Sequence, residues 1–166
     1  MRTLVNLTAL FAVGTLLAAG CGSSKRSSSS TTQPGAAPTV GNASDLKAKP
    51  QIGAGTAPKP GQLVVKDLVV GTGAGATPSS TVRVQYVGVN YDNGKEFDSS
   101  WSRGQPADFP LNGVIPGFSQ GIVGMKVGGR RELVIPPDLG YGARGSPPAV
   151  GPNETLVFVI DLLAVQ

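Results

Sequence analysis

The residues best placed to do chemistry are Phe97 and Asp98, which follow an Asn93-Gly94 pair. Asn-Gly before alternating polar and apolar residues predicts a β-hairpin, because both residues tolerate the positive φ angles of tight hairpin turns. The strand after this turn carries an aromatic ring and a carboxylate at neighbouring positions. The chain has no histidine and a single cysteine, so few other positions could hold chemistry, and no disulfide is possible within it.

Other candidate residues come from separate segments, most of them at segment ends or in Gly- and Pro-rich loops. Tyr141 stands between Gly140 and Gly142, a backbone freedom that a core aromatic rarely needs. If these residues converge, they form an apolar cup with a few polar atoms at its rim, which is the usual composition of a small-ligand site. The whole set is Tyr86, Phe97, Asp98, Val114, Ile115, Phe118, Tyr141 and Phe158.

A structural explanation is also open for several of these residues. Tyr86 and Phe158 could simply be core aromatics. Asp98 could cap a turn beside Ser99 and Ser100, since Asp side chains often hydrogen-bond the backbone of a turn. A cap and a functional carboxylate are compatible roles for the same residue.

The elements that must position the cup are mostly strands. Residues 63–70, 81–90, 130–135 and 155–165 show strand patterns, and the last has apolar residues on both faces, which predicts a central strand covered on both sides. One segment predicts a helix, because Pro116 suits a first helical turn and Phe118, Ile122 and Met125 recur at i, i+4 and i+7. We therefore predict an α+β fold with a strongly bent antiparallel β-sheet, a half-barrel, wrapped around one short α-helix.

Residues 1–21 predict an export signal, with Arg2 as the positive n-region before an apolar stretch too short to span a membrane comfortably. Its end, Leu17-Ala18-Ala19-Gly20-Cys21, resembles the lipobox of bacterial lipoproteins, in which the cysteine becomes a lipidated N-terminus. The alternative is an ordinary secretory signal followed by an unrelated cysteine. We expect lipidation at Cys21 and a place in the cell envelope, on the outer face of the cytoplasmic membrane or the periplasmic side of an outer membrane.

Residues 22–60 predict a disordered Ser/Pro/Gly-rich tether, because they contain few large apolar side chains. Residues 61–166 are then the single folded domain. Eight of the 14 basic and nine of the 10 acidic residues lie in it, so the domain is close to neutral and the positive excess of the chain comes from the first 60 residues. This distribution argues against nucleic-acid binding. Arg130 and Arg131 are expected at a solvated strand edge.

Six segments of this domain closely resemble the FKBP-type peptidyl-prolyl cis-trans isomerases and occur in that family's order. They are residues 84–88, 94–100, 113–118, 121–128, 135–142 and 156–158. The resemblance runs from about residue 63 to residue 165. It implies the same bent sheet around a short helix, and a peptidyl-prolyl cis-trans isomerase that uses no cofactor and no metal.

The resemblance also assigns roles within the cup. Phe118 stands where an indole usually lies under the proline ring, with Tyr86, Phe97 and Phe158 around it. Asp98 would lie beside the rotating carbonyl with Arg103 as its ionic neighbour, the Ile115 N–H would bond the peptide, and the Tyr141 hydroxyl a substrate carbonyl. The implied catalytic residues are Asp98, Tyr141, Tyr86 and Phe97, and the implied substrate-binding residues are Val114, Ile115, Phe118, Phe158, Arg103, Ala149 and Val150.

Two positions depart from the family pattern. Ala107 stands where a phenylalanine often lines the pocket, and Ser146 replaces a histidine on a late loop. Both open or depolarise the rim, which bears on sequence preference and macrolide affinity. The implied partners are proline-containing polypeptides, tacrolimus-like macrolides and a membrane through the lipid anchor, with a monomer expected. The alternatives are a non-catalytic chaperone or adaptor that holds Pro-containing segments, and a structural lipoprotein.

Overall fold

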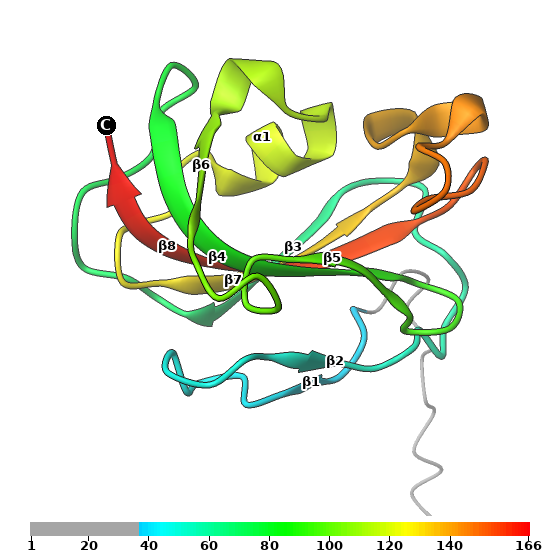
Figure 1. Cartoon of the computed structure of the whole chain (residues 1–166), viewed down its shortest axis with the longest axis horizontal. Coiled ribbons are helices and arrows are strands. Elements are labelled where there is room, and N and C mark those ends of the chain that lie inside the picture. The colour runs from blue at the N-terminus through cyan, green and yellow to red at the C-terminus, as the bar shows by residue number, and fades with distance from the viewer. Residues whose placement is uncertain (1–36) are drawn as a thin grey trace, which may run out of the picture. The chain divides into compact units, whose positions relative to one another are not determined.

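The computed structural model describes residues 37–166, which form an antiparallel sheet bent around one short helix (Figure 1). The strand order is β3-β7-β8-β4-β5, and β6 also pairs with β4. The predicted α+β fold is confirmed, and the sheet is not closed into a barrel. The strands are β3 (Val64–Val69), β4 (Thr81–Asn90), β5 (Glu96–Ser99), β6 (Ala107–Pro110), β7 (Arg130–Ile135) and β8 (Leu156–Val165), and the helix is α1 (Pro116–Ile122).

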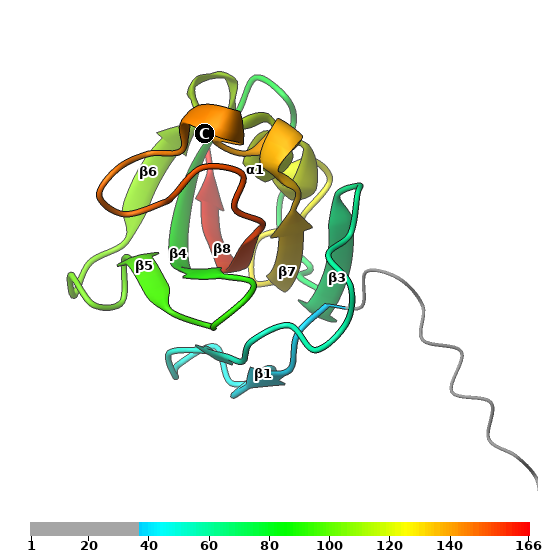
Figure 2. The ribbon, with the colours of Figure 1, turned by 90° about the vertical axis from the view of Figure 1, so that its right-hand side faces the viewer.

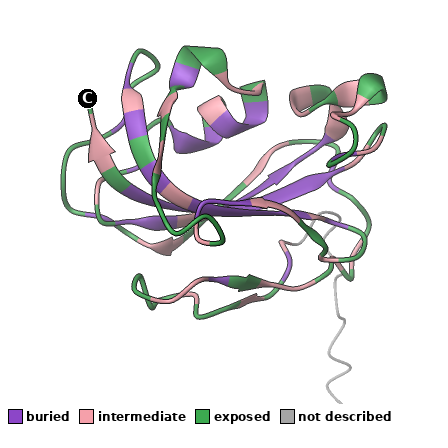
Figure 3. Ribbon diagram, in the orientation of Figure 1, coloured by how far each residue is buried: buried purple, intermediate pink, exposed green. Residues whose placement is uncertain are grey.

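Strand β8 is the centre of the sheet, as its two apolar faces predicted. It lies between β7 and β4 and is buried from Leu156 to Leu162 (Figure 3). On β4 the residues Val82, Val84 and Tyr86 belong to the same core cluster as residues of α1. This inner face of the sheet therefore holds the main core, and α1 covers it.

Two glycines of α1 lie against the sheet at positions where no side chain would fit. A Cβ atom on Gly117 would lie 2.4 Å from Ile135, and one on Gly121 would lie 2.4 Å from Leu133. These glycines weaken the helix intrinsically, yet they permit its close approach to β7. The helix ends at Ile122, before Met125, which the periodicity had placed on the same helix. Met125 is buried in the core nonetheless, because Gly124 turns the chain after the helix with a φ of +80°.

The predicted hairpin joins β4 to β5, and its loop is longer than the two-residue form. Strand β4 ends at Asn90 and β5 begins at Glu96. Only Gly94 takes a positive φ, +67°, while the Asn93 side chain accepts a 2.8 Å hydrogen bond from the Lys95 N–H. Three 3-10 helices complete the described elements: η1 (Leu111–Gly113), η2 (Pro137–Leu139) and η3 (Gly142–Arg144).

The prediction of a disordered tether is wrong for residues 37–60, which we call the strap. The strap contains two paired strands, β1 (Val40–Gly41) and β2 (Gln51–Ile52), and lies on the side of the sheet opposite α1 (Figure 1 and Figure 2). We call the covered side the outer face. Composition failed here because polar contacts hold the strap, which adds only the partly buried Ile52 to the outer face and has no apolar core of its own. The rest of the predicted tether and signal, Cys21 included, lies outside the described residues.

Arg130 is the main anchor of the strap and is fully buried, in contrast to the predicted solvated edge. It donates to the strap carbonyls of Asn42 and, at 3.0 Å, Ala48. It also pairs through two hydrogen bonds with Asp161 of β8, one of 2.7 Å. Burial raises the pKa of Asp161, while the Arg130 guanidinium opposes that rise. A desolvated ion pair thus joins the sheet to the strap.

The outer face also holds an apolar cluster and a buried carboxyl group. Val87, Val89 and Val157 pack there with Ile52 of the strap and with Trp101. The Glu132 side chain is fully buried 3.6 Å from the Lys66 ammonium, and burial raises its pKa to about 7.

Among residues 37–166, no helix has the length and apolar character needed to cross a membrane.

Candidate active site

An apolar cup of about 310 Å³ opens on the inner side of the sheet next to α1. Strands β4, β5, β6 and β8, the η1–α1 connection, α1 itself and the η2–η3 connection all contribute to it. The structure places all eight of the converging residues predicted from the sequence in its lining, and adds two more. The lining is Tyr86, Phe97, Asp98, Phe109, Gly113, Val114, Ile115, Phe118, Tyr141 and Phe158.

The base of the cup is a cluster of rings that meet edge to face. The Phe118 ring centroid lies 5.3 Å from that of Phe158 and 5.7 Å from that of Phe109. Phe97 meets Phe158 at 5.5 Å. Such arrangements are favoured by the ring quadrupoles, and tightly packed rings keep a fixed apolar surface. The base can therefore receive a small apolar ring without rearranging.

Gly88 makes room for two of these rings. A Cβ atom at this position would lie 2.7 Å from Phe97 and 2.8 Å from Phe158, closer than any real contact. Gly88 pairs with Phe158 of β8 on one side and with Asp98 of β5 on the other. The glycine in the β4 sequence is thus a local requirement of the cup.

Asp98 lies at the rim in a network with Tyr86 and Arg103. The Tyr86 hydroxyl donates to one carboxylate oxygen, and the Arg103 guanidinium donates to the other. Arg103 also donates to the Tyr86 hydroxyl at 2.8 Å and lies over the Tyr86 ring, 5.5 Å from its centroid. Burial, followed by the Asp98 hydrogen bond, raises the pKa of Tyr86 to about 12. Tyr86 therefore remains a donor that orients the carboxylate at neutral pH.

Two hydrogen-bond donors lie on other sides of the rim. Tyr141 is 37% exposed, and burial followed by the Asp98 charge raises the pKa of its hydroxyl, so it remains protonated. Ile115 precedes α1, where its carbonyl accepts the Phe118 and Ser119 N–H groups. Its own N–H bonds no other residue in the part of the chain that the structure describes. Both donors could reach the carbonyl groups of a bound peptide.

Three predicted substrate-binding residues lie outside the lining. Arg103 contacts Asp98 and Tyr86 instead. Val150 is buried in the core, and Ala149 is exposed in the turn closed by the Ser146 N–H and the Val150 carbonyl at 2.8 Å. The substrate-binding roles expected for Ala149 and Val150 therefore remain predictions, and neither residue lines the cup itself.

Gly113 adds only backbone to the lining, and Phe109 is the lining side chain that the sequence reasoning missed. It lies on β6, two residues after Ala107 and so on the same face of that strand. Ala107 itself packs on the core without lining the cup. The alternation of apolar and polar residues over positions 107–110 could have predicted this strand. The Phe109 ring lines this side of the cup, although Ala107 has no ring to contribute.

Within residues 37–166 no cluster of three or more His, Cys, Asp or Glu side chains could hold a metal ion.

Comparison with known proteins gives a consistent result. Residues 73–163 match the family described as "FKBP-type peptidyl-prolyl cis-trans isomerase". The chain is 54% identical over 116 residues to a "Probable FK506-binding protein" of Corynebacterium glutamicum, covering 70% of this chain and 98% of that protein. It is 49% identical over 120 residues to an "FK506-binding protein" of Streptomyces anulatus, covering 70% and 97%. The crystal structure of FkpA from Escherichia coli superposes with a TM-score of 0.60 and 48% identity, covering 63% of this chain and 48% of that one.

Proposed function

The chain belongs to the FKBP-type peptidyl-prolyl cis-trans isomerases, and from this we propose that the cup is its catalytic pocket and that its substrates are exported proteins. The observation that carries the assignment of the pocket is the Asp98 carboxylate, held by Tyr86 and Arg103 at the rim of an aromatic cup. An exposed carboxylate so firmly oriented beside a cavity suits recognition of a substrate dipole. Phe118 would lie under the proline ring, with Phe97 and Phe158 beside it.

The chemistry required of such a pocket is rotation about the bond before proline. The barrier is about 18–20 kcal/mol because the amide resonance must be broken. Uncatalysed X-Pro exchange takes tens of seconds or longer. The twisted transition state has lost conjugation and is less dipolar than the planar amide. An apolar cup therefore binds the twisted form better than the planar forms, and this differential binding lowers the barrier.

The residues at the rim would act on the twisted peptide without any covalent step. The Ile115 N–H and the Tyr141 hydroxyl would hold carbonyl groups on either side of the rotating bond. Asp98 would lie beside the rotating carbonyl, where its charge favours the geometry in which the carbonyl dipole has turned. No proton leaves or enters the substrate, so the absence of histidine does not count against catalysis.

Replacing Tyr141 by phenylalanine tests the rim. We expect the full chain to accelerate cis-to-trans exchange in a short X-Pro peptide, and Tyr141→Phe to lower kcat/KM by about three- to tenfold, since a neutral hydrogen bond contributes about 0.5–1.5 kcal/mol. The measurement is exchange NMR at equilibrium, with peptide binding followed in the same samples. If the chain binds the peptide without accelerating exchange, the adaptor alternative is correct and the catalytic assignment of the cup fails.

We also propose that a lipid on Cys21 holds the isomerase in the cell envelope. The sequence around Cys21, the short apolar stretch before it and the basic residues Lys25 and Arg26 after it support this location. Basic residues near an anionic surface add about 1 kcal/mol each, which would reinforce a single acyl anchor. Clients would then be exported polypeptides that meet the enzyme outside the cytoplasmic membrane.

Cys21→Ser should move the protein from the membrane fraction to the soluble fraction, because serine lacks the thiol to which the proposed lipid is attached. Fractionation of cells that express the wild-type chain or the variant gives the measurement. Isomerase activity should be equal in both proteins once detergent is present. Unchanged membrane association of the variant would refute the anchor and favour an ordinary secretory signal.

The relatives that are named for FK506 binding extend the proposal to macrolides. The cup of this chain keeps an aromatic base and the two rim donors that such a ligand would need, with Phe109 beside them. We therefore propose that tacrolimus-like macrolides compete with proline-containing peptides for the cup. A monomer would suffice for this, since every lining residue comes from one chain.

A further inference from the structure

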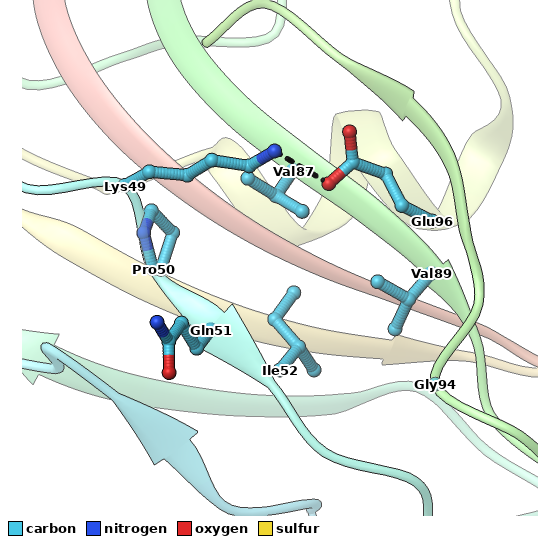
Figure 4. A pocket seen from close by; sticks show the side chains of 8 residues that line it. All are labelled: Lys49, Pro50, Gln51, Ile52, Val87, Val89, Gly94 and Glu96. Atoms are coloured by element: carbon cyan, nitrogen blue, oxygen red, sulfur yellow. Dashed lines mark ion pairs between the residues drawn. The ribbon is translucent and has the colours of Figure 1, made fainter. Parts of the chain in front are cut away.

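Lys49 of the strap contacts two residues of one short segment on the far side of the cup. Its ammonium lies 2.7 Å from a Glu96 carboxylate oxygen and 2.9 Å from the Ser102 hydroxyl oxygen. The Ser102 hydroxyl donates at 2.8 Å to the other oxygen of Glu96. These three contacts form a closed ring, and Figure 4 shows the Lys49–Glu96 part of it.

The segment tied by this ring, residues 96–103, carries the polar rim of the cup. Glu96 immediately precedes Phe97, and Ser102 immediately precedes Arg103. Asp98 lies between them and receives the guanidinium of Arg103. Glu96 lines the hollow on the outer face, while both Phe97 and Asp98 line the cup. The register shift between Gly88 and Val89 interrupts the alternation of side chains at this point. The ring on the outer face therefore fixes both ends of a segment whose inner face is the rim.

The middle of this segment is held to β4, because the buried Ser100 bonds Tyr86 and Gln85 through its N–H and hydroxyl groups. The side chains near its two ends, Glu96 and Ser102, bond each other and Lys49 instead. Strand β5 is an edge strand, and its pairing with β4 shifts register between Gly88 and Val89. A hollow of about 350 Å³ lies between the strap and the sheet beside Glu96 (Figure 4). At this point the ion pair, rather than close packing of side chains, connects the strap to β5. The strap itself is held firmly, because Arg130 donates to the carbonyl of Ala48, the residue before Lys49. Lys49 thus links the anchored strap to side chains near both ends of the rim segment.

We propose that Lys49 is a positioning residue for catalysis, through which the strap holds Asp98 and Arg103 at the rim of the cup. This inference rests on the proposed function of the cup. Position 49 lies outside residues 73–163, which match the family model. The side chains of Lys49 and Glu96 are 40% and 35% exposed, and pairs of that exposure contribute little to stability. The expected effect is therefore on the geometry of the rim.

Lys49→Met, made in the full chain, tests the link because it removes the ammonium and keeps the apolar stem. We expect kcat for X-Pro exchange to fall about three- to tenfold with a smaller change in KM, because misplacement of a catalytic group acts mainly on the transition state. Lys49→Arg should restore most of the rate, since its guanidinium can reach the same oxygens. The matched control is Lys59→Met, which removes the strap's 2.7 Å ion pair with Asp92.

Trp101 gives a readout that does not depend on activity. It is the only tryptophan in the chain and lies within the tied segment, packed on the outer-face cluster. Lys49→Met should shift its fluorescence emission, and Lys59→Met should leave it unchanged. An unshifted emission, or a rate for Lys49→Met equal to that of Lys59→Met, overturns the inference. An inactive wild-type chain would refute the proposed function instead, and Trp101 would still report whether Lys49 holds the segment.

Discussion

Replacing Asp98 by asparagine should lower kcat/KM for X-Pro exchange by about tenfold to a hundredfold. The carboxylate accepts from Tyr86 and Arg103, and hydrogen bonds to a charged group contribute about 1.5–3 kcal/mol. Asparagine keeps the shape of the side chain but loses its charge. Its amide NH2 group would face one of these two donors and could not accept a hydrogen bond from it. A difference of about 1.4 kcal/mol corresponds to tenfold in rate. The measurement is exchange NMR with the same peptide used for the wild-type chain.

Asp108→Asn is the matched control for this variant. Asp108 pairs with Arg83 through hydrogen bonds of 3.0 and 3.1 Å, and the side chains of Asp108 and Asp98 are 45% and 41% exposed. The control therefore removes the charge of a similar Asp–Arg pair that does not line the cup, and its rate should remain within twofold of the wild type. Equal rates for the two variants would show that the Asp98 charge takes no part in lowering the barrier.

The sequence was sufficient to predict the cup because its residues belong to short segments with strong local constraints. Gly88 must lack a side chain beside Phe97 and Phe158, and Pro116 starts the helix that presents Phe118. Such constraints are visible in a few neighbouring residues. The bent sheet followed from strand patterns of the same local kind, above all the two apolar faces of β8.

The strap could not be predicted because its contacts join residues far apart in the sequence. Arg130 donates to carbonyl groups of Asn42 and Ala48, which lie 88 and 82 residues away. Backbone carbonyls have no sequence signature, so a Ser/Pro/Gly-rich composition suggested disorder although a buried arginine supplies the anchor. Phe109 was missed for a related reason. Its strand, β6, has only four residues and is placed by pairing with β4.

Replacing Asp161 by asparagine should lower the free energy of unfolding by about 3–5 kcal/mol, because removing one partner of a buried ion pair leaves the other charge desolvated. The Arg130 side chain is fully buried and that of Asp161 is 4% exposed. Few other single substitutions in the chain should cost as much. The measurement is urea unfolding of the full chain, in which the midpoint should fall while the slope stays unchanged.

Two further variants separate the effect of the buried pair from its hold on the strap. Asp67→Asn removes the 41% exposed partner of Arg131 and should cost less than about 1 kcal/mol. In the double variant Arg130→Met, Asp161→Leu no charge is left buried, so much of the lost stability should return. It should not return fully, because the Asn42 and Ala48 carbonyls have lost their donor. The double variant should therefore be stable yet show a shifted Trp101 emission. Unchanged emission would mean that the strap is held without Arg130.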